Sequence, residues 1–293
     1  MKKIHFYKSG SRLGLKNPPW GSAELNIGVE DGPDAILTAE FLSAFPEAAI
    51  DEFTFLKPEG IDDSSYFKIL ADSYGKFEGK INDTIEAGET QVAIGGDHSI
   101  TFATISALLD RIQSPEQLGY IQIDSHPDML LYSQSSTKNF HGMYLRALLS
   151  DFDIPEINNL APKKLMPQNM WFIGNLDFDG PERDFFESHK IRHTSVQQLC
   201  NGRAMFVAQL ENFVRRYEYI HLSFDVDGLD RSLVSATGIP AKDGLLEEHF
   251  MPVIEAVKNH PGLSFELVEL NPRKQGASAS IKVCQSILSR LLI

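Results

Sequence analysis

Two short runs of aspartate and histidine most strongly limit the fold that this sequence can adopt: Asp-Ser-His-Pro-Asp at residues 124–128 and Asp-Val-Asp at residues 225–227. Each run directly follows an apolar segment of strand length, and so does a third motif, Gly-Gly-Asp-His at residues 95–98. If these segments are strands of one parallel sheet, their carboxyl ends lie along one edge, where open α/β sheets bind ligands. We therefore expect the polar side chains of all three motifs to meet at that edge.

Apolar segments alternate with helical segments along the whole chain. The central apolar segments are nearly continuous and rich in β-branched residues, which is typical of parallel strands covered on both faces. We predict a single α/β domain over residues 1–293, with a doubly wound, mostly parallel sheet and helices on both faces. The predicted strands are 3–7, 50–56, 91–94, 119–123, 170–173, 219–224 and 264–268, and the predicted helices are 35–45, 65–87, 100–112, 205–217, 247–259 and 278–292.

Long irregular stretches interrupt this alternation, at residues 8–29, 130–140, 154–168 and 227–244. Two of them directly follow the aspartate motifs. Loops of that length inside a compact domain are usually functional. Glu-Leu-Asn-Pro at residues 269–272 follows the last predicted strand in the same way, so a fourth polar motif is expected at the same edge.

Composition limits the classes of partner. The chain has 40 acidic and 27 basic residues, a net charge of −13 and no lysine- or arginine-rich block, so nucleic acid and anionic membranes are poor partners. Its two cysteines are far apart and indicate neither a disulfide framework nor a thiolate metal cluster. No apolar stretch is long enough for a membrane span or a secretory signal, so we expect a cytoplasmic protein. The negative charge permits a cationic substrate, although solubility alone also explains it.

The three motifs supply six candidate metal ligands: His98, Asp124, His126, Asp128, Asp225 and Asp227. The four carboxylates carry more negative charge than one divalent ion can neutralise, whereas two such ions balance it. Carboxylates readily bridge a pair of ions held about 3.5–4 Å apart. Oxygen and imidazole ligands without thiolate favour Mn²⁺, with Co²⁺, Fe²⁺ or Zn²⁺ as substitutes. We therefore predict two Mn²⁺ ions per subunit.

The alternate spacing of the ligands has a structural explanation. In extended backbone, residues i, i+2 and i+4 point to one face, so Asp-x-His-x-Asp would bring three donors together. For one Asp-x-Asp alone, capping or a turn would explain the pattern better. Three such motifs together would repel one another if buried without a cation. Gly95 and Gly96 would let the backbone turn sharply and deliver His98, and Asp97 is a candidate partner for an imidazole.

At these residues the chain resembles the ureohydrolases, and most closely the arginases. Six strings carry the resemblance in family order, and Gly-Val-Glu-Asp-Gly-Pro at residues 28–33 resembles the family's opening motif. The six are Gly-Gly-Asp-His-Ser (95–99), Asp-Ser-His-Pro-Asp (124–128), Asn-Phe-His-Gly-Met (139–143), Ser-Phe-Asp-Val-Asp-Gly-Leu-Asp (223–230), Ala-Thr-Gly-Ile-Pro (236–240) and Glu-Leu-Asn-Pro (269–272).

The resemblance implies a doubly wound α/β fold with a binuclear manganese centre that hydrolyses the guanidinium of L-arginine to urea and L-ornithine. Hydroxide between the two ions would attack the guanidinium carbon. The resemblance also implies a homotrimer or homohexamer. The implied ligand pairs are His98 with Asp128 for one ion and His126 with Asp227 for the other, bridged by Asp124 and Asp225.

The resemblance further implies roles for other residues. Asp128 would carry a proton toward the leaving amine, His141 would exchange protons with solvent, and Glu269 would hold the guanidinium. Without the resemblance, a packed loop histidine would be the simpler explanation of His141, and Glu269 could equally pair with Arg273. The implied substrate-binding residues are Thr137 and Asn139 toward the carboxylate, Asp179 toward the α-amino group, Thr237, and Glu269 toward the guanidinium.

The chain departs from the arginase pattern at the end of the site that would receive the amino acid. Leu130 stands where arginases usually have asparagine, which removes a donor to the α-carboxylate, and Arg231 and Ser235 replace prolines of a nearby loop. Two alternatives therefore stay open. The chain could be an agmatinase or another ureohydrolase of guanidino compounds, or a metal-binding family member without catalytic activity.

Overall fold

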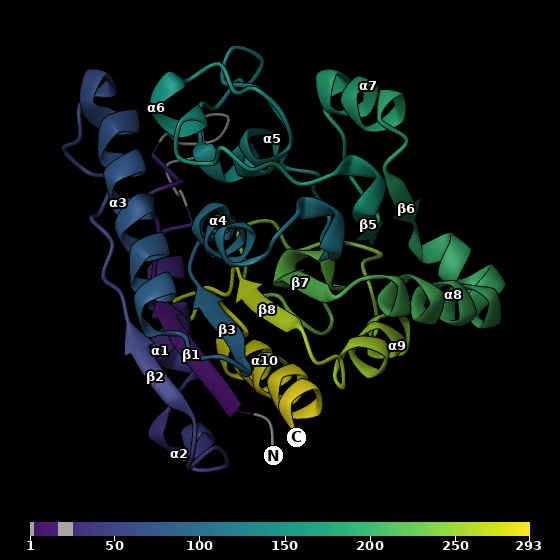
Figure 1. Ribbon diagram of the computed structural model, residues 1–293. Coiled ribbons are helices and arrows are strands. Elements are labelled where there is room, and N and C mark those ends of the chain that lie inside the picture. The colour runs from purple at the N-terminus through teal and green to yellow at the C-terminus, as the bar shows by residue number, and fades with distance from the viewer. Residues whose placement is uncertain (1–2, 17–25) are drawn as a thin grey trace.

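Eight parallel strands form one sheet in the computed structural model, which describes residues 3–16 and 26–293 (Figure 1). The order across the sheet is β2-β1-β3-β8-β7-β4-β5-β6, and every strand pair is parallel. The predicted α/β fold class is thereby confirmed. The strands are β1 Lys3–Ser9, β2 Ala49–Glu52, β3 Glu89–Gly95, β4 Leu118–Ile123, β5 Met170–Ile173, β6 Arg192–Thr194, β7 Tyr219–Asp225 and β8 Leu263–Val268.

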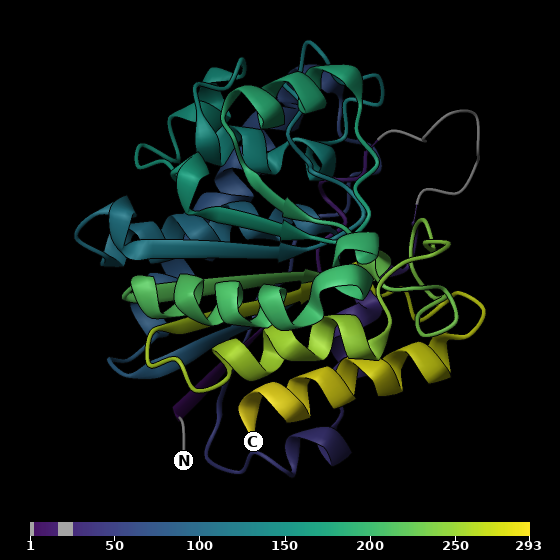
Figure 2. The same ribbon diagram turned by 90° about the vertical axis from the view of Figure 1, so that its right-hand side faces the viewer.

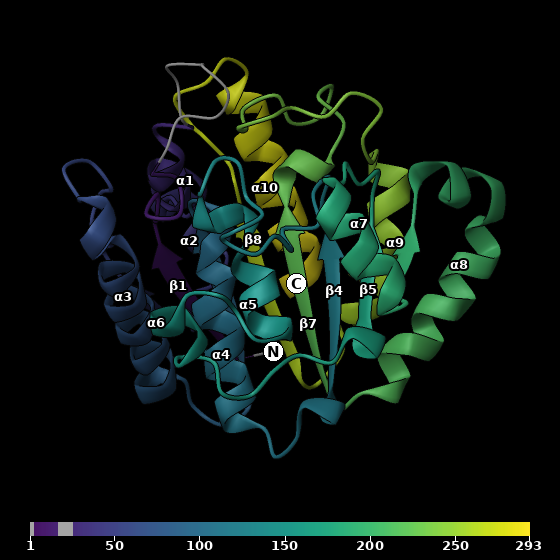
Figure 3. The ribbon, with the colours of Figure 1, turned by 90° about the horizontal axis from the view of Figure 1, so that it is seen from above.

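Helices cover both faces of the sheet because alternate side chains of each buried strand point to opposite faces. On β7, Ile220, Leu222 and Phe224 pack against the layer that contains α8, α9 and α10, which lies below the sheet in Figure 2. On β4, Tyr120 packs against the other layer, seen in front of the sheet in Figure 3. The first layer comprises α1 Gly32–Ile36, α2 Ala39–Leu42, α8 Val196–Arg216, α9 Glu247–Val257 and α10 Ala277–Leu292, and the second α3 Asp63–Thr84, α4 Thr101–Arg111, α5 Tyr144–Leu149, α6 Pro155–Asn158 and α7 Gly180–Ser188.

Several element boundaries differ from the sequence prediction for local reasons. The predicted helix 35–45 is two short helices, because α1 ends at Ile36 and Thr38 caps the start of α2 by accepting the amide of Phe41. The predicted helix 205–217 begins earlier as α8, where Ser195 and Gln198 form a capping box. The strand β6 and the helices α5, α6 and α7 were not predicted. Residues 17–25 of the predicted irregular stretch lie outside the described part of the chain.

The strands that precede the four polar motifs are neighbours in the middle of the sheet. Ile94 of β3 and Phe224 of β7 both pair with Leu267 of β8, and Ile123 of β4 pairs with Phe224. This register makes the four strands end level, on the side to which the arrowheads point in Figure 2. The polar motifs therefore begin side by side. Among the described residues, no helix is long and apolar enough to cross a membrane.

Gly96 allows the backbone of the first loop to contact the end of β3. The amide of Asp97 donates to the carbonyl of Ser11 at 2.8 Å. A Cβ atom at Gly96 would lie 1.9 Å from that same carbonyl oxygen, so no other residue fits without moving one of the two chains. The predicted need for glycine before His98 thus has a specific cause, which is close backbone approach.

We predict that Gly96→Ala lowers the free energy of unfolding by about 1–3 kcal/mol, because the added methyl group overlaps backbone. Gly79→Ala is the matched control, since Gly79 lies inside α3 and a Cβ atom there meets nothing within 4 Å. That control should gain about 0.5–1 kcal/mol from helix propensity. Urea denaturation measures both changes, and equal stabilities of the two variants would contradict the overlap.

Candidate active site

His98 lies at the centre of three carboxylates, in the turn His98–Ile100 after β3. Its Nδ1 atom is 3.2 Å from Asp124 Oδ2, 3.2 Å from Asp128 Oδ2 and 3.1 Å from Asp225 Oδ2. This buried nitrogen has no hydrogen-bond partner of suitable geometry among the described residues. A nitrogen lone pair and three carboxylate oxygens that converge in this way are a donor set for a divalent cation.

His126 anchors a second group beside the first. Its Nδ1 atom is 3.1 Å from Asp227 Oδ2 and 3.8 Å from Asp124 Oδ1. Asp227 is oriented by Ser125, whose hydroxyl donates to Oδ1 at 2.8 Å. The first group, His98 with Asp124 and Asp225, and the second, Asp124 with His126 and Asp227, share Asp124. The six predicted ligands therefore meet, and their arrangement fits two neighbouring cations.

Turns, and not extended backbone, bring the aspartates together. Asp225 ends β7, and its Oδ1 accepts the amide of Asp227 at 2.7 Å in the turn Val226–Gly228. Asp124 Oδ1 accepts the amide of His126 at 2.7 Å, and Asp128 has a left-handed φ of 54°. The predicted extended spacing is thus wrong. Asp124 and Asp225 each cap a turn with one oxygen and offer the other to His98.

Proximity perturbs the acid–base behaviour of the whole cluster. Burial raises the pKa of Asp124 to about 7 against the lowering effect of the His98 imidazole, and the neighbouring carboxylates of Asp227 and Asp128 add to the rise. Burial, Asp227 and Asp124 likewise raise the pKa of Asp225 well above its usual range. Burial acts against ionised Asp227 too, but the His126 and His98 imidazoles outweigh it and lower the pKa of Asp227 to about 2. The cluster therefore holds more carboxylate than the two imidazoles can neutralise.

A polar layer inside the sheet supports the cluster. Gln122, two residues before Asp124 on β4, donates to Asp124 Oδ2 at 2.6 Å and accepts the Tyr120 hydroxyl at 2.7 Å. Ser223, two residues before Asp225 on β7, lies 2.8 Å from His98 Nε2. Sequence reasoning missed these residues. The sequence does carry a signal for them, which is a polar residue two positions before a ligand inside an otherwise apolar strand. Buried polar side chains are nearly always hydrogen-bonded, so such a residue is expected to contact the ligand.

Most of the predicted site residues line one cavity of about 310 Å³ above the cluster. Thr237 does not. It is fully buried and its hydroxyl has no partner among the described residues, so direct contact of Thr237 with a substrate is not supported. Asp124 is fully buried and is not among the lining residues. The predicted residues on the lining are His98, His126, Asp128, Thr137, Asn139, His141, Asp179, Asp225, Asp227 and Glu269.

Glu269 is held in place from both sides at the cavity floor. Its Oε1 accepts the backbone amide of His98 at 3.0 Å, and its Oε2 accepts the side-chain amide of Asn26 at 2.8 Å. His141 Nδ1 lies 3.7 Å from Oε1. Arg273 pairs with Asp31 instead, so the alternative pairing of Glu269 with Arg273 is wrong. Asn26 was not predicted as a site residue.

Asp97 plays a different part from the one expected. It contacts no imidazole among the described residues. It accepts hydrogen bonds from the Ser11 hydroxyl, the Gly14 amide and the Ser99 amide at 3.0–3.1 Å. The Gly14 carbonyl in turn accepts the amide of His141 at 3.3 Å. Asp97 thus connects the first loop to the segments that carry His98 and His141.

Comparison with known proteins agrees with this geometry. A parallel α/β sheet with an aspartate–histidine cluster at its carboxyl edge is the arrangement expected of a metal-dependent hydrolase. The family model described as "Arginase family" matches residues 18–293, so the chain belongs to the arginase family and is an amidino hydrolase. The resemblance found in the sequence is thereby confirmed.

Individual relatives match over most of their length. Human Arginase-1 is 28% identical over 277 residues, which cover 89% of this chain and 85% of the relative. Among solved structures, Entamoeba histolytica arginase in complex with L-ornithine has a TM-score of 0.86 at 22% identity, covering 99% of this chain and 98% of that one. Bacillus caldovelox arginase has a TM-score of 0.86 at 24% identity with the same coverage. At these identities the structures show the shared fold.

We predict that Gln122→Met weakens binding of Mn²⁺ about tenfold, because Asp124 loses the donor that orients it. Gln91→Met is the matched control. Gln91 is also buried in a strand and hydrogen-bonds Thr104 and Arg111, away from the cluster. Calorimetric titration of the metal-free variants measures the affinities. An equal loss in both variants would mean that Gln122 acts only through stability.

Metal binding should release protons. Burial lowers the pKa of His98 and His126, but the neighbouring carboxylates outweigh it and hold both pKa values well above their usual range. A cation needs their lone pairs and an ionised Asp124. The affinity for Mn²⁺ should therefore rise as the pH rises through about 7, the pKa of Asp124. Calorimetry in buffers of different ionisation enthalpy counts the protons, and a pH-independent affinity would contradict the raised pKa values.

Proposed function

We propose that the chain is a manganese-dependent arginase that hydrolyses L-arginine to urea and L-ornithine. The observation that carries this proposal is the position of Glu269, which is fixed by two donors beside the aspartate–histidine cluster. A carboxylate held there would bind a guanidinium through charge-assisted hydrogen bonds. The charged residues on the lining are acids and histidines, without lysine or arginine among those described, which favours a cationic substrate.

The six ligands would hold two divalent cations. Mn²⁺ suits a set of carboxylate and imidazole donors, and Co²⁺ is the natural substitute. When bound, such a pair supplies a nucleophile from water near neutral pH and neutralises developing negative charge. In this assignment the ligands are His98 with Asp128, His126 with Asp227, and the shared Asp124 and Asp225.

The remaining residues would bind the substrate and move protons. Glu269 would orient the guanidinium so that its carbon lies above the cluster. Asp128, at the cavity wall, would accept a proton and pass it to the leaving amine. The His141 side chain is 33% exposed, so it would exchange protons between the cavity and solvent. The nearby Glu269 outweighs burial and raises the pKa of His141, which suits it to that task.

The far end of the cavity is where an amino acid and a simple amine differ. Thr137 and Asn139 would supply donors to an α-carboxylate, and Asp179 would bind the α-amino group. Leu130 also lines the cavity, and its side chain offers a carboxylate no hydrogen bond. This one residue favours the second candidate, an agmatinase or a related ureohydrolase of guanidino compounds.

Urea release from a panel of guanidino compounds tests the proposal. The metal-free protein is loaded with Mn²⁺ and assayed with L-arginine, agmatine and other guanidino acids. Release of urea from L-arginine supports the arginase assignment, and release from agmatine alone supports the second candidate. Failure to cleave any of them, with two ions bound, would leave a metal-binding protein without this activity.

Glu269→Gln should reduce kcat with L-arginine by at least about a hundredfold while sparing the metal content, because the neutral amide loses the charge that holds the cation. Glu47→Gln, an exposed change between α2 and β2, is the control and should leave both unchanged. Metal content is measured by mass spectrometry on the same samples. Loss of bound metal in Glu269→Gln would mean that the residue is a ligand.

Leu130→Asn should lower the KM for L-arginine by about threefold to tenfold, because it restores a donor toward the carboxylate. The KM for agmatine, which lacks that carboxylate, should stay the same. A change in the KM for L-arginine alone indicates a contact with the carboxylate. A change in both KM values indicates a general change of the cavity. An unchanged KM for L-arginine would show that other groups recognise its carboxylate.

A further inference from the structure

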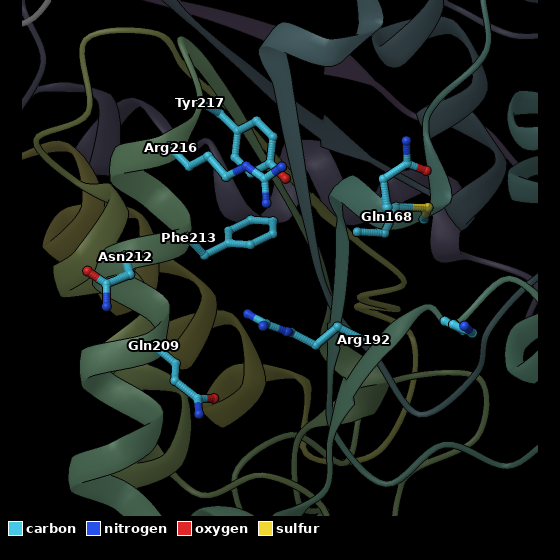
Figure 4. Close-up of a pocket in the computed structure, with 9 residues that line it drawn as sticks. Gln168, Arg192, Gln209, Asn212, Phe213, Arg216 and Tyr217 are labelled. Atoms are coloured by element: carbon cyan, nitrogen blue, oxygen red, sulfur yellow. The ribbon is translucent and has the colours of Figure 1, made fainter.

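A second cavity, of about 470 Å³, lies at the opposite edge of the sheet from the candidate active site. It forms where β5 and β6 begin, at Met170 and Arg192, and the C-terminal half of α8 covers it with Phe213 (Figure 4). The strands are parallel, so their starting ends lie a full strand length from the aspartate–histidine cluster. The two cavities share no lining residue.

Positive charge gathers in this second cavity. Lys190, Arg192 and Arg216 line it, and none of its nine described lining residues is acidic. The concentration is notable in a chain with a net charge of −13. The nearby Glu211 does not line the cavity, and its carboxylate lies 3.7 Å from the guanidinium of Arg215. Three like charges in one concave surface favour an anionic ligand.

Aromatic rings hold the two guanidinium groups in place. The Arg192 guanidinium carbon lies 4.4 Å from the centroid of the Trp171 ring, and that of Arg216 lies 5.5 Å from the Tyr217 ring. Stacking occupies the face of a guanidinium and leaves its N–H edge available. In Figure 4 the two arginines extend from opposite walls toward the space beside Phe213.

Neutral donors complete the lining. Asn212 is among the lining residues, and its side-chain oxygen accepts a hydrogen bond from Arg215 at 2.7 Å. Gln168 and Gln209 contribute further amides from opposite sides. We propose that this cavity binds a small oxyanion that carries phosphate or carboxylate groups. Guanidinium forks bind both groups through paired hydrogen bonds.

Fluorescence titration tests this proposal. The metal-loaded protein is titrated with inorganic phosphate and, separately, with succinate. In a Trp20→Phe background, Trp171 is the single tryptophan, and its position beside Arg192 makes it the reporter. We expect saturable binding of at least one probe, with a dissociation constant of about 1 mM or tighter, that weakens as sodium chloride is added. The probe with the lower dissociation constant shows whether the cavity recognises phosphate or carboxylate groups.

Charge-removing variants locate the site. Arg192→Gln and Arg216→Gln should each weaken binding about tenfold or more, measured by calorimetry so that changes around Trp171 do not interfere. Arg203→Gln, an exposed change on α8 outside the cavity, is the control and should bind like the parent. Circular dichroism verifies that each variant is folded. The proposal is overturned if neither probe binds saturably. It is also overturned if Arg216→Gln and Arg203→Gln bind the probe equally well.

Discussion

The mutual repulsion of buried carboxylates at the carboxyl edge of the sheet is the constraint on which the rest of the structure depends. Asp124 contacts both His98 and His126, whereas Asp225 contacts His98 and Asp227 contacts His126. Removing such charges from water costs several kcal/mol per ion unless they are paired. Backbone amides and the imidazoles offset part of that cost. Divalent cations would offset the remainder, and this is why the cluster fits a metal centre better than a purely structural network.

The packing of the central strands holds the residues of this dense cluster in place. Each is buried on both faces, so the ends from which the ligands project are held rigidly by packing above and below. Within these strands Gln122 and Ser223 contact Asp124 and His98 and orient them from beneath. Glu269, the group that would bind the guanidinium, is fixed by donors from two other segments. The sheet therefore positions both the candidate metal ligands and the residue that faces them.

Predictions from sequence were most accurate where burial leaves a periodic pattern. The central strands were found because they are continuous apolar runs, whereas β6, with the sequence Arg-His-Thr at the edge of the sheet, carries no such run. The helix α7 escaped detection even though Asp179 and Glu182 form a capping box at its start. The resemblance to the arginases assigns Asp179 only a contact with the substrate. One aspartate can both cap a helix and contact a substrate. When it is interpreted only as a substrate contact, the helix start that it indicates is overlooked.

The sequence by itself determined the donors, their grouping after strand-like segments and the resemblance to the arginases. Only the tertiary structure decided that β3, β8, β7 and β4 are neighbours, which brings His98 against Asp225. It also placed Thr237 inside the protein and Asn26 beside Glu269, and it assembled the cationic cavity from three separate segments. The physical reason is that periodicity records whether each residue is buried, whereas strand order depends on how distant helices pack over the sheet, and no local pattern encodes that packing.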